Sequence, residues 1–366
     1  MNISIIRENL LAPLQHVIGA VERKQTLPIL GNVLFQSVGG KVLLTATDLE
    51  IELVASLDGS LNEDFAITLP ARKLLDICKA LPDGSEISIK IEENSVTLTS
   101  ARTRFQLSSL PAKDFPALED IEYYTEFEMP QSKLKLLIDK TAFAMAQQDV
   151  RYYLNGMLIE LKQDGLKLVA TDGHRLALSE YEQALGISTQ KQLIVPRKGV
   201  MELARLLDNS EEMATVKLSQ NHIRIETGTL TFTSKLIDGK FPDYNRVIPV
   251  DGNRILSVNR EHLRHSLQRI SILSNEKYRG IRLTLSDNTL SIQANNPDQE
   301  EAQEEMTVEY DEETIEIGFN VTYLLDVLSV LDSEEVAIKL KDANSSCIIT
   351  ASDTDAFRYV VMPMRL

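Results

Sequence analysis

The sequence contains few cysteines and no long apolar run. Cys78 and Cys347 are its only cysteines, and they show none of the paired spacings that bind zinc. This pattern excludes a disulfide framework and a zinc ribbon, and it favours a reducing, cytosolic location. No stretch of about 18 apolar residues occurs, and Arg7 and Glu8 interrupt the first apolar segment. We therefore expect neither a membrane span nor a signal peptide.

Sequence motifs of common catalytic sites are missing as well. Gly40 and Lys41 are followed by Val42, where a phosphate-binding loop requires Ser or Thr. Neither a GxSxG elbow nor an HExxH helix occurs. His262 and His265 lie three residues apart on a predicted helix, but the sequence nominates no third metal ligand. We expect no catalytic residue, no metal site and no cofactor, and an enzyme with a cryptic active site is a disfavoured alternative.

The chain is strongly acidic. Its 366 residues include 38 Lys and Arg against 54 Asp and Glu, which gives a formal net charge of -16. The hydrophobic share of 43% is that of an ordinary globular protein, and the length predicts two or three domains. Nucleic-acid binding normally goes with a basic surface. A nucleic-acid partner would therefore require the basic residues to gather locally.

An internal repeat runs through the chain with a period near 124 residues. LLTATDLEIEL, LKLVATDGHRLAL and LSIQANNPDQEEA share one pattern, and 124 residues separate Thr47 from Thr171 and Thr171 from Asn295. Two helical stretches, each with apolar residues three and four positions apart, recur with a similar step. The first stretch begins at Arg7, Gln131 and Arg260, and the second begins at Pro70, Pro196 and Asn320.

Between these helices, short runs alternate apolar and polar residues. EISIKIEENSVTLTS, MLIELKQDGLKLVA and IRLTLSDNTLSIQA are antiparallel strand patterns, with turn signals at Asp83-Gly84, Asp164-Gly165 and Asp287-Asn288. We predict an α+β fold of three repeated domains, each with two helices packed on antiparallel sheet. The predicted domains comprise residues 1–124, 125–252 and 253–366.

Basic residues gather on the predicted helices although the whole chain is acidic. Five of the six helical stretches are neutral or basic, and only the stretch from Asn320 to Asp332 is negative. Lys and Arg also favour solvated helix faces by propensity, so charge alone leaves both interpretations open. Three like repeats can, however, place like faces side by side and build one basic surface. The candidate residues for nucleic-acid contact on this surface are Arg72, Arg197, Lys198 and Arg205.

His174 lies in the motif TDGHR, flanked by Asp172 and Arg175, which suggests a catalytic group at first sight. The first repeat has Thr-Asp-Leu-Glu at residues 47–50, in the same turn and without a histidine. We therefore interpret the aspartate as turn chemistry that the repeats share.

Several specific strings resemble the bacterial sliding clamp family, the beta subunit of DNA polymerase III. They are TLPILGN at Thr26, QDVRYYLNGM at Gln148, ATDGHRLA at Ala170, VPRKGV at Val195, FPDY at Phe241, LSNEKYRG at Leu273 and the ending VVMPMRL at Val360. The resemblance covers the whole chain. It implies a head-to-tail homodimer whose six domains close a ring around double-stranded DNA, with helices inside. Such a ring would slide without sequence specificity and confer processivity on the polymerase.

The resemblance also implies residues that touch DNA. It carries this role to Gln148, Tyr152 and Tyr153 of the QDVRYY loop, where rings can contact backbone and unpaired bases. Either tyrosine can instead be a core residue. Lys24 stands where family members carry an arginine, which keeps the charge but loses bidentate phosphate geometry.

A second implied site is a hydrophobic peptide-binding pocket at the junction of the central and C-terminal domains. Short Leu- and Phe-containing motifs of the polymerase alpha subunit, the clamp loader, other polymerases and repair proteins are the expected ligands. Methionines suit such a surface because they adapt to several ligands. Asn344 departs from the apolar wall residue expected there. The matching positions are Leu154, Thr171, Gly173, His174, Arg175, Leu176, Pro242, Arg246, Val247, Val360, Val361, Met362, Pro363 and Met364.

The ring requires complementary ends for dimerisation. Ten acidic residues and no basic ones lie from Asp298 to Glu316, whereas SARTRFQL in the first repeat presents two arginines on a predicted edge strand. Complementary charge sets the register of such an interface. The candidate interface residues are Lys73, Arg102, Arg104, Phe105 and Leu107 at one end, with Ile272, Leu273, Glu300 and Glu304 at the other.

Two functions of different classes follow from these patterns. The first is a non-catalytic, cytoplasmic, nucleoid-associated clamp that encircles DNA and tethers the polymerase. The alternative is a monomeric peptide-binding scaffold whose basic helices face solvent. Pairing of the chain ends, and binding that depends on DNA topology, distinguish the two.

Overall fold

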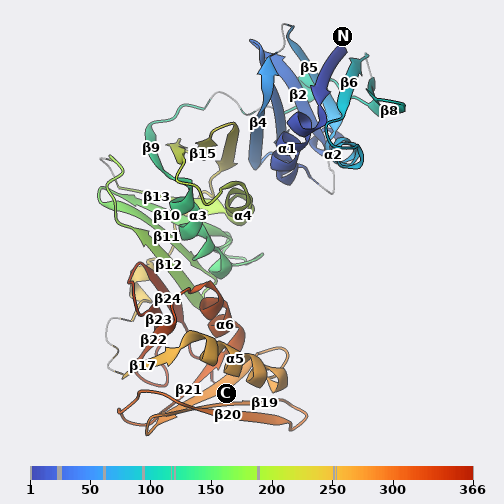
Figure 1. The fold of residues 1–366 in the computed structure, drawn as a ribbon. Coiled ribbons are helices and arrows are strands. Elements are labelled where there is room, and N and C mark those ends of the chain that lie inside the picture. The colour runs from blue at the N-terminus through green and yellow to red at the C-terminus, as the bar shows by residue number, and fades with distance from the viewer. Residues whose placement is uncertain are drawn as a thin grey trace. The chain divides into compact units, whose positions relative to one another are not determined.

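The computed structural model describes residues 2–22, 27–60, 63–92, 95–116, 118, 121–187, 190–249, 252 and 254–365. The chain divides into two compact units. The first unit comprises Met1–Leu134 and Met201–Leu236, and the second comprises Lys135–Val200 and Ile237–Leu366. Each unit contains one four-stranded and one eight-stranded antiparallel sheet (Figure 1).

The first unit takes its strands from the N-terminal repeat and from part of the central repeat. Its four-stranded sheet has the order β1 (Asn2–Ile6), β6 (Glu86–Ile91), β7 (Ser95–Ser100) and β8 (Thr103–Ser108). Its eight-stranded sheet has the order β5 (Phe65–Pro70), β2 (Asn32–Val38), β3 (Lys41–Thr47), β4 (Ile51–Ser60), β16 (Leu230–Lys235), β15 (His222–Thr227), β14 (Met213–Leu218) and β9 (Thr125–Pro130).

Two helices of the N-terminal repeat pack between these strands. Helix α1 (Arg7–Val17) contacts α2 (Ala71–Ala80), and it also contacts β1 of one sheet and β3 and β4 of the other. Its buried face includes Leu10, Leu14 and Val17, which recur at helical spacing. The apolar face predicted from the sequence therefore builds the core of this unit.

The second unit repeats this arrangement with strands from the central and C-terminal repeats. Its four-stranded sheet has the order β20 (Glu301–Thr307), β19 (Thr289–Asn295), β18 (Gly280–Ser286) and β21 (Ile315–Asn320). Its eight-stranded sheet has the order β13 (Lys191–Pro196), β10 (Gly156–Lys162), β11 (Gly165–Thr171), β12 (Arg175–Tyr181), β24 (Phe357–Val361), β23 (Cys347–Ala351), β22 (Glu335–Leu340) and β17 (Arg254–Asn259).

Helices α5 (Arg260–Ile270) and α6 (Val321–Val330) contact each other and strands of both sheets in the second unit. Asparagine side chains cap both helices, since Asn259 accepts from the His262 N–H and Asn320 from the Thr322 N–H. The central helices are α3 (Gln131–Asp139) and α4 (Arg197–Leu206). The six α-helices in the described part of the chain begin within one residue of the predicted starts.

The predicted fold is confirmed, with one addition. Strand β4 of the N-terminal repeat pairs with β16 of the central repeat, from Ile51 with Ser234 to Ala55 with Leu230. In the same way β12 pairs with β24, from Arg175 with Val361 to Ser179 with Phe357. The sheets therefore continue from one repeat into the next, which the repeat pattern did not predict.

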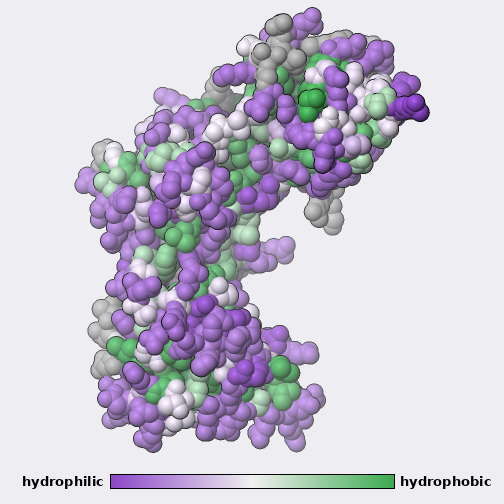
Figure 2. Space-filling view, viewed as in Figure 1, coloured by the Kyte–Doolittle hydropathy of each residue, from purple (hydrophilic) through white to green (hydrophobic). Residues whose placement is uncertain are grey.

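The turn signals and the cysteines also agree with the sequence. Asp287 and Asn288 join β18 to β19 with positive φ angles of 48° and 60°, as a tight hairpin requires. Cys78 and Cys347 are free and buried, and burial raises the pKa of their thiols to about 11 and about 12. None of the helices in the described residues is both long and apolar enough to cross a membrane. Hydrophilic residues cover most of the face drawn in Figure 2.

Candidate functional site

The turn between β11 and β12 is held by its own side chains. Thr171 Oγ1 donates to the Arg175 carbonyl oxygen at 2.6 Å and accepts from the Gly173 N–H at 3.1 Å. Asp172 Oδ1 accepts from the N–H groups of His174 and Arg175 at 2.9 and 3.0 Å. Gly173 has a φ of 90°, a conformation that suits glycine. The Asp172 side chain thus stabilises the backbone of the turn.

The other repeats use the same chemistry. Asp48 Oδ1 accepts from the N–H groups of Glu50 and Ile51 at 2.9 and 2.8 Å, and Thr47 Oγ1 donates to the Ile51 carbonyl oxygen. In the third repeat Asn296 Oδ1 accepts from the N–H groups of Asp298 and Glu300. The interpretation of the aspartate as shared turn chemistry is confirmed.

Arg175 connects this turn to two other segments of the second unit. Its guanidinium donates to Asp172, to Asp326 of α6 and to the Phe143 carbonyl oxygen, the last at 2.9 Å. It also lies over the ring of Tyr323, with its central carbon 4.7 Å from the centroid. Since only 12% of the side chain is exposed, Arg175 positions the site and presents little charge to solvent.

The QDVRYY loop is fixed to the same turn by Arg151, which the sequence reading missed. Arg151 forms an ion pair with Asp149 at 2.9 Å and donates to the Asp172 carbonyl oxygen at 3.1 Å. Hydrogen bonds from the side chain and then from the backbone N–H of Arg151 lower the pKa of Asp149 to about 2. Asn155 closes the loop by donating to the Asp149 carbonyl oxygen. The Asp-x-Arg spacing was the available signal, because it places opposite charges two residues apart.

The two tyrosines of this loop differ in exposure. Tyr152 is 56% exposed, and Tyr153 is half-buried against the hydrophobic cluster of the second unit. Their rings meet edge to face at 5.7 Å. Gln148 is exposed, with a positive φ of 55°. The arrangement leaves Gln148 and Tyr152 accessible to a ligand, and their contact with DNA stays a prediction.

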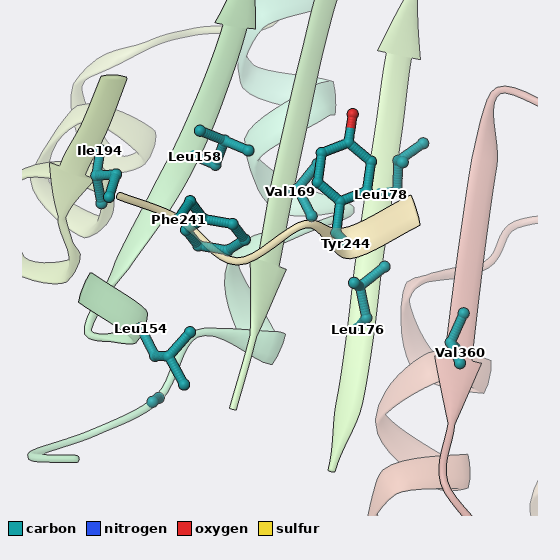
Figure 3. Packing of buried hydrophobic residues seen from close by; sticks show 10 residues of the cluster. Leu154, Leu158, Val169, Leu176, Leu178, Ile194, Phe241, Tyr244 and Val360 are labelled. Atoms are coloured by element: carbon teal, nitrogen blue, oxygen red, sulfur yellow. The ribbon is translucent and has the colours of Figure 1, made fainter. Parts of the chain in front are cut away.

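Three predicted pocket residues belong to one buried hydrophobic cluster. Leu154, Leu176 and Val360 come from three separate segments, and Figure 3 shows them beside a segment that carries Phe241 and Tyr244 across strands of the sheet. The Tyr244 hydroxyl donates to Glu160. Burial, followed by this hydrogen bond, raises the pKa of Tyr244. The cluster forms a buried apolar base for the predicted pocket.

The other predicted pocket residues surround this base. The Met362 N–H donates to the His174 carbonyl oxygen at 2.9 Å, and the Met364 N–H donates to the Gly318 carbonyl oxygen at 2.9 Å. The chain end thereby runs beside β12. The residues that remain wholly or partly exposed are Thr171, Gly173, His174, Arg175, Pro242, Arg246, Val247, Met362, Pro363 and Met364, whereas Val361 is buried. Peptide binding here stays a prediction.

The predicted basic contacts fall into two groups. Arg72 on α2 and Lys198 on α4 are exposed. Arg197 is half-buried and donates to the Met145 carbonyl oxygen at 3.2 Å, and burial lowers its pKa. Arg205 donates to the carbonyl oxygens of Gln15 and His16 at the end of α1. Lys24 lies outside the described residues.

The predicted interface residues lie at two sheet edges. Strand β8 is an edge of its four-stranded sheet, as the sequence predicted, and β20 is an edge of the other. Lys73, Arg102 and Arg104 are exposed, Phe105 is half-buried and Leu107 is buried. Ile272 is 76% exposed, beside the half-buried Leu273. Glu300 is exposed, and Glu304 pairs with Arg269 of its own chain.

Comparison with known proteins covers the whole chain. Models for the N-terminal, central and C-terminal domains of the DNA polymerase III beta subunit match residues 1–119, 128–243 and 245–365. The chain is 54% identical over 370 residues to the beta sliding clamp of Pseudomonas aeruginosa and 48% identical over 367 residues to that of Escherichia coli strain K12, with full coverage of both chains in each case.

Solved structures agree with this result. A crystal structure of the DNA polymerase III subunit beta from Pseudomonas aeruginosa matches with a TM-score of 0.97 at 54% identity, and the same organism's clamp bound to griselimycin matches with a TM-score of 0.96. The Caulobacter crescentus pol III beta matches with a TM-score of 0.94 at 36% identity. Each match covers 100% of both chains.

Proposed function

The chain belongs to the DNA polymerase III beta subunit family, the beta sliding clamps, and from this premise we propose that it forms a homodimeric ring around duplex DNA. In this proposal the ring slides without reading sequence. It tethers the replicative polymerase and other replication and repair proteins, and it has no catalytic activity of its own. We place it in the cytoplasm at the nucleoid, where its DNA substrate lies.

The sheet edges are the observation that supports the proposed homodimer. Strand β8 ends one sheet of the first unit beside Arg102 and Arg104, and β20 ends one sheet of the second unit with Glu301 and Glu305 exposed. Unpaired edges are templates for pairing with another chain, and opposite charge fixes which edges meet. Two copies in head-to-tail order join each basic edge to an acidic one. We propose that the domain boundaries in this ring lie near residues 124 and 252.

Weak phosphate contacts suit the proposed sliding. Arg72 and Lys198 are exposed bases on two helices, whereas Arg197 and Arg205 already donate to carbonyl oxygens of the chain. A protein that neutralises few phosphates binds DNA weakly, and such contacts carry no sequence information. Retention on DNA then comes from the closed ring, so a small number of exposed basic residues is consistent with the function.

Tethering is assigned to the pocket around Leu154, Leu176 and Val360. Its base is buried and apolar, and Met362 and Met364 at its side are half-buried. A preformed apolar base favours Leu and Phe anchors, and methionine adapts to different partners. We propose that short motifs of the polymerase alpha subunit, the clamp loader and repair proteins bind here.

Topology provides the test. Purified protein is loaded onto nicked circular DNA with a purified clamp loader, and retention is compared before and after the circle is cut. The ring proposal predicts that bound protein is lost from the linear product through its ends, and that blocking both ends restores retention. Equal retention on open linear and circular DNA would exclude encirclement and favour the monomeric peptide-binding scaffold.

A further inference from the structure

The first unit contains a cavity of about 480 Å³ that the proposed function does not use. Four parts of the first unit line it: the turn that follows β3, the connection that includes Pro116, Leu118, Ile121 and Glu122, the turn between β14 and β15, and the end of β16. Leu49, Leu118 and Ile121 supply an apolar wall, and His222 and Lys235 lie on the polar side. The volume is within the usual range for a small-ligand site.

The internal repeat relates this cavity to the pocket of the second unit. Thr47 and Leu49 correspond to Thr171 and Gly173 at a spacing of 124 residues. The Lys235 N–H donates to the Glu50 carbonyl oxygen at 2.9 Å, just as the Met362 N–H donates to the His174 carbonyl oxygen. Lys235 therefore takes the place that Met362 has beside the predicted peptide pocket.

The connections that run past the two sites correspond as well. Phe115-Pro116 and Phe241-Pro242 lie 126 residues apart, and both phenylalanines are buried. Pro116 lines the cavity. The two repeats thus build the same framework and differ in the side chains that face the ligand space.

Leu49 is held in a backbone conformation that a residue with a Cβ disfavours. Its φ is 76°, whereas the corresponding position in the central repeat is the glycine Gly173 with a φ of 90°. The Leu49 side chain nevertheless lines the cavity and is 41% exposed. Strain of this kind persists where a side chain has a role, and here it keeps an apolar group at the mouth of the cavity.

His222 provides an unused hydrogen-bonding position on the opposite side. Its Nε2 atom is buried and has no hydrogen-bond partner among the described residues. Burial, and then the charges of Lys235 and Arg224, lower the pKa of this imidazole. The neutral ring can donate one hydrogen bond from Nε2, and Lys235 is exposed beside it.

We infer that this cavity is a second peptide-binding site, which takes an extended segment with a leucine-type side chain and a carboxylate. The side chain packs on Leu49, Leu118 and Ile121, and the carboxylate accepts from His222 and faces Lys235. Glu122, the lining acid, lies on the connection and can accept from the segment's backbone N–H groups. The site differs from the apolar pocket because a cation replaces Met362.

The inference extends the peptide-binding part of the proposed function, and one experiment distinguishes the two sites. The full-length protein, with labelled methyl groups, is titrated with N-acetyl-Leu-Leu carrying a free C-terminal carboxylate and with its C-terminal amide, up to about 10 mM. We expect saturable shifts of the Leu49, Leu118 and Ile121 methyl signals. The acid should bind there at least about threefold more tightly than the amide, the usual effect of one exposed charge pair.

Two substitutions and one control sharpen the test. Lys235→Met should remove the preference for the acid, and Leu49→Gly should weaken both probes about threefold or more without lowering the thermal midpoint, because glycine relieves the positive φ. Met362→Ala should leave binding at this cavity unchanged. Methyl shifts confined to Leu154 and Leu176 would overturn the inference and leave the proposed function intact. Shifts at neither site, or equal binding of acid and amide, would also overturn it.

Discussion

The Arg175 guanidinium has partners in the turn between β11 and β12, on α6 and at Phe143. It donates to Asp172, Asp326 and the Phe143 carbonyl oxygen, and it stacks on Tyr323. Removal of one member of a buried pair leaves the others unpaired, which costs more than the pair contributes. The residue is therefore a structural centre of the site as well as one of its predicted pocket residues.

We expect Arg175→Ala to lower the free energy of unfolding of the second unit by about 2 to 3 kcal/mol. Arg246→Ala is the matched control, because its side chain is 84% exposed and forms an ion pair with the exposed Asp243. The control should change stability by less than about 0.5 kcal/mol. Urea unfolding of both variants measures the difference, and equal effects would contradict the structural role of Arg175.

Acid should open the QDVRYY loop before it unfolds the protein. Hydrogen bonds from Arg151 lower the pKa of Asp149 from 3.8 to about 2. Because the folded-state pKa lies below the unfolded one, the stabilisation is complete above about pH 4 and is lost as the pH falls towards about 2. A carboxyl-carbon NMR titration follows Asp149 directly.

The substitution Arg151→Ala provides the control for this titration. It should return the Asp149 pKa towards the ordinary value of about 3.9. Arg151→Lys should give a smaller change, because lysine keeps the charge but not the forked hydrogen bonds. An unshifted Asp149 pKa in the alanine variant would show that the ion pair does not control the loop.

For individual residues, the sequence predicted interactions between groups that lie close together along the chain. The Asp48 and Asp172 turns followed from the repeat, because the capping atoms lie within three residues of the groups they cap. The cross-connection of Arg151 to the Asp172 carbonyl oxygen and the unpaired Nε2 of His222 did not follow. Both depend on segments that meet only in the folded chain.

Among the elements, α5 and α6 carry asparagine caps, whereas α1 and α2 have no side-chain cap. An asparagine at this position satisfies one of the free N–H groups of the first turn. The apolar period predicted the starts of these helices to within one residue, including the two that have no side-chain cap.

We expect Asn259→Ala to destabilise the second unit by about 1 kcal/mol. Asn259→Asp should retain the stability, because a carboxylate also caps the helix and interacts favourably with its N-terminal dipole. Thermal unfolding compares these variants with Asn245→Ala, an exposed asparagine outside the α-helices. A loss in the aspartate variant as large as in the alanine variant would contradict a capping role.

The pairing of elements was harder to predict than their existence. Alternating apolar and polar residues mark β4, β16, β12 and β24 as strands, but alternation does not identify the neighbour of a strand. The two eight-stranded sheets arise because strands of successive repeats pair. A reading by repeats therefore found the three-domain fold and missed the continuity of the sheets between successive repeats.

For the whole molecule, the proposed ring requires a stable homodimer. Sedimentation at several salt concentrations should give twice the chain mass of 41.0 kDa, with some loosening at high salt because the paired edges carry opposite charges. Replacing Ile272 and Leu273 together by alanine should yield the monomer. Ile272 is 76% exposed in the single chain, and the proposed interface would bury it.

A single exposed residue elsewhere serves as control for the dimer. Val150→Ala removes a large apolar side chain that is 95% exposed, and it should leave the mass unchanged because Val150 lies outside the proposed interface. An unchanged dimer mass in the Ile272 and Leu273 variant would contradict the interface assignment. A monomer at every concentration in the unmodified protein would contradict the ring.

The continuous sheets have a mechanical consequence. Within each compact unit, a pulling force along the sheet loads five backbone pairs at once, between β4 and β16 or between β12 and β24. Covalent connections and cooperative hydrogen bonds share that load, so the junction between successive repeats resists mechanical separation. In the proposed ring the seams between chains have no covalent link. Under tension the proposed ring should therefore separate where β8 of one chain meets β20 of the other.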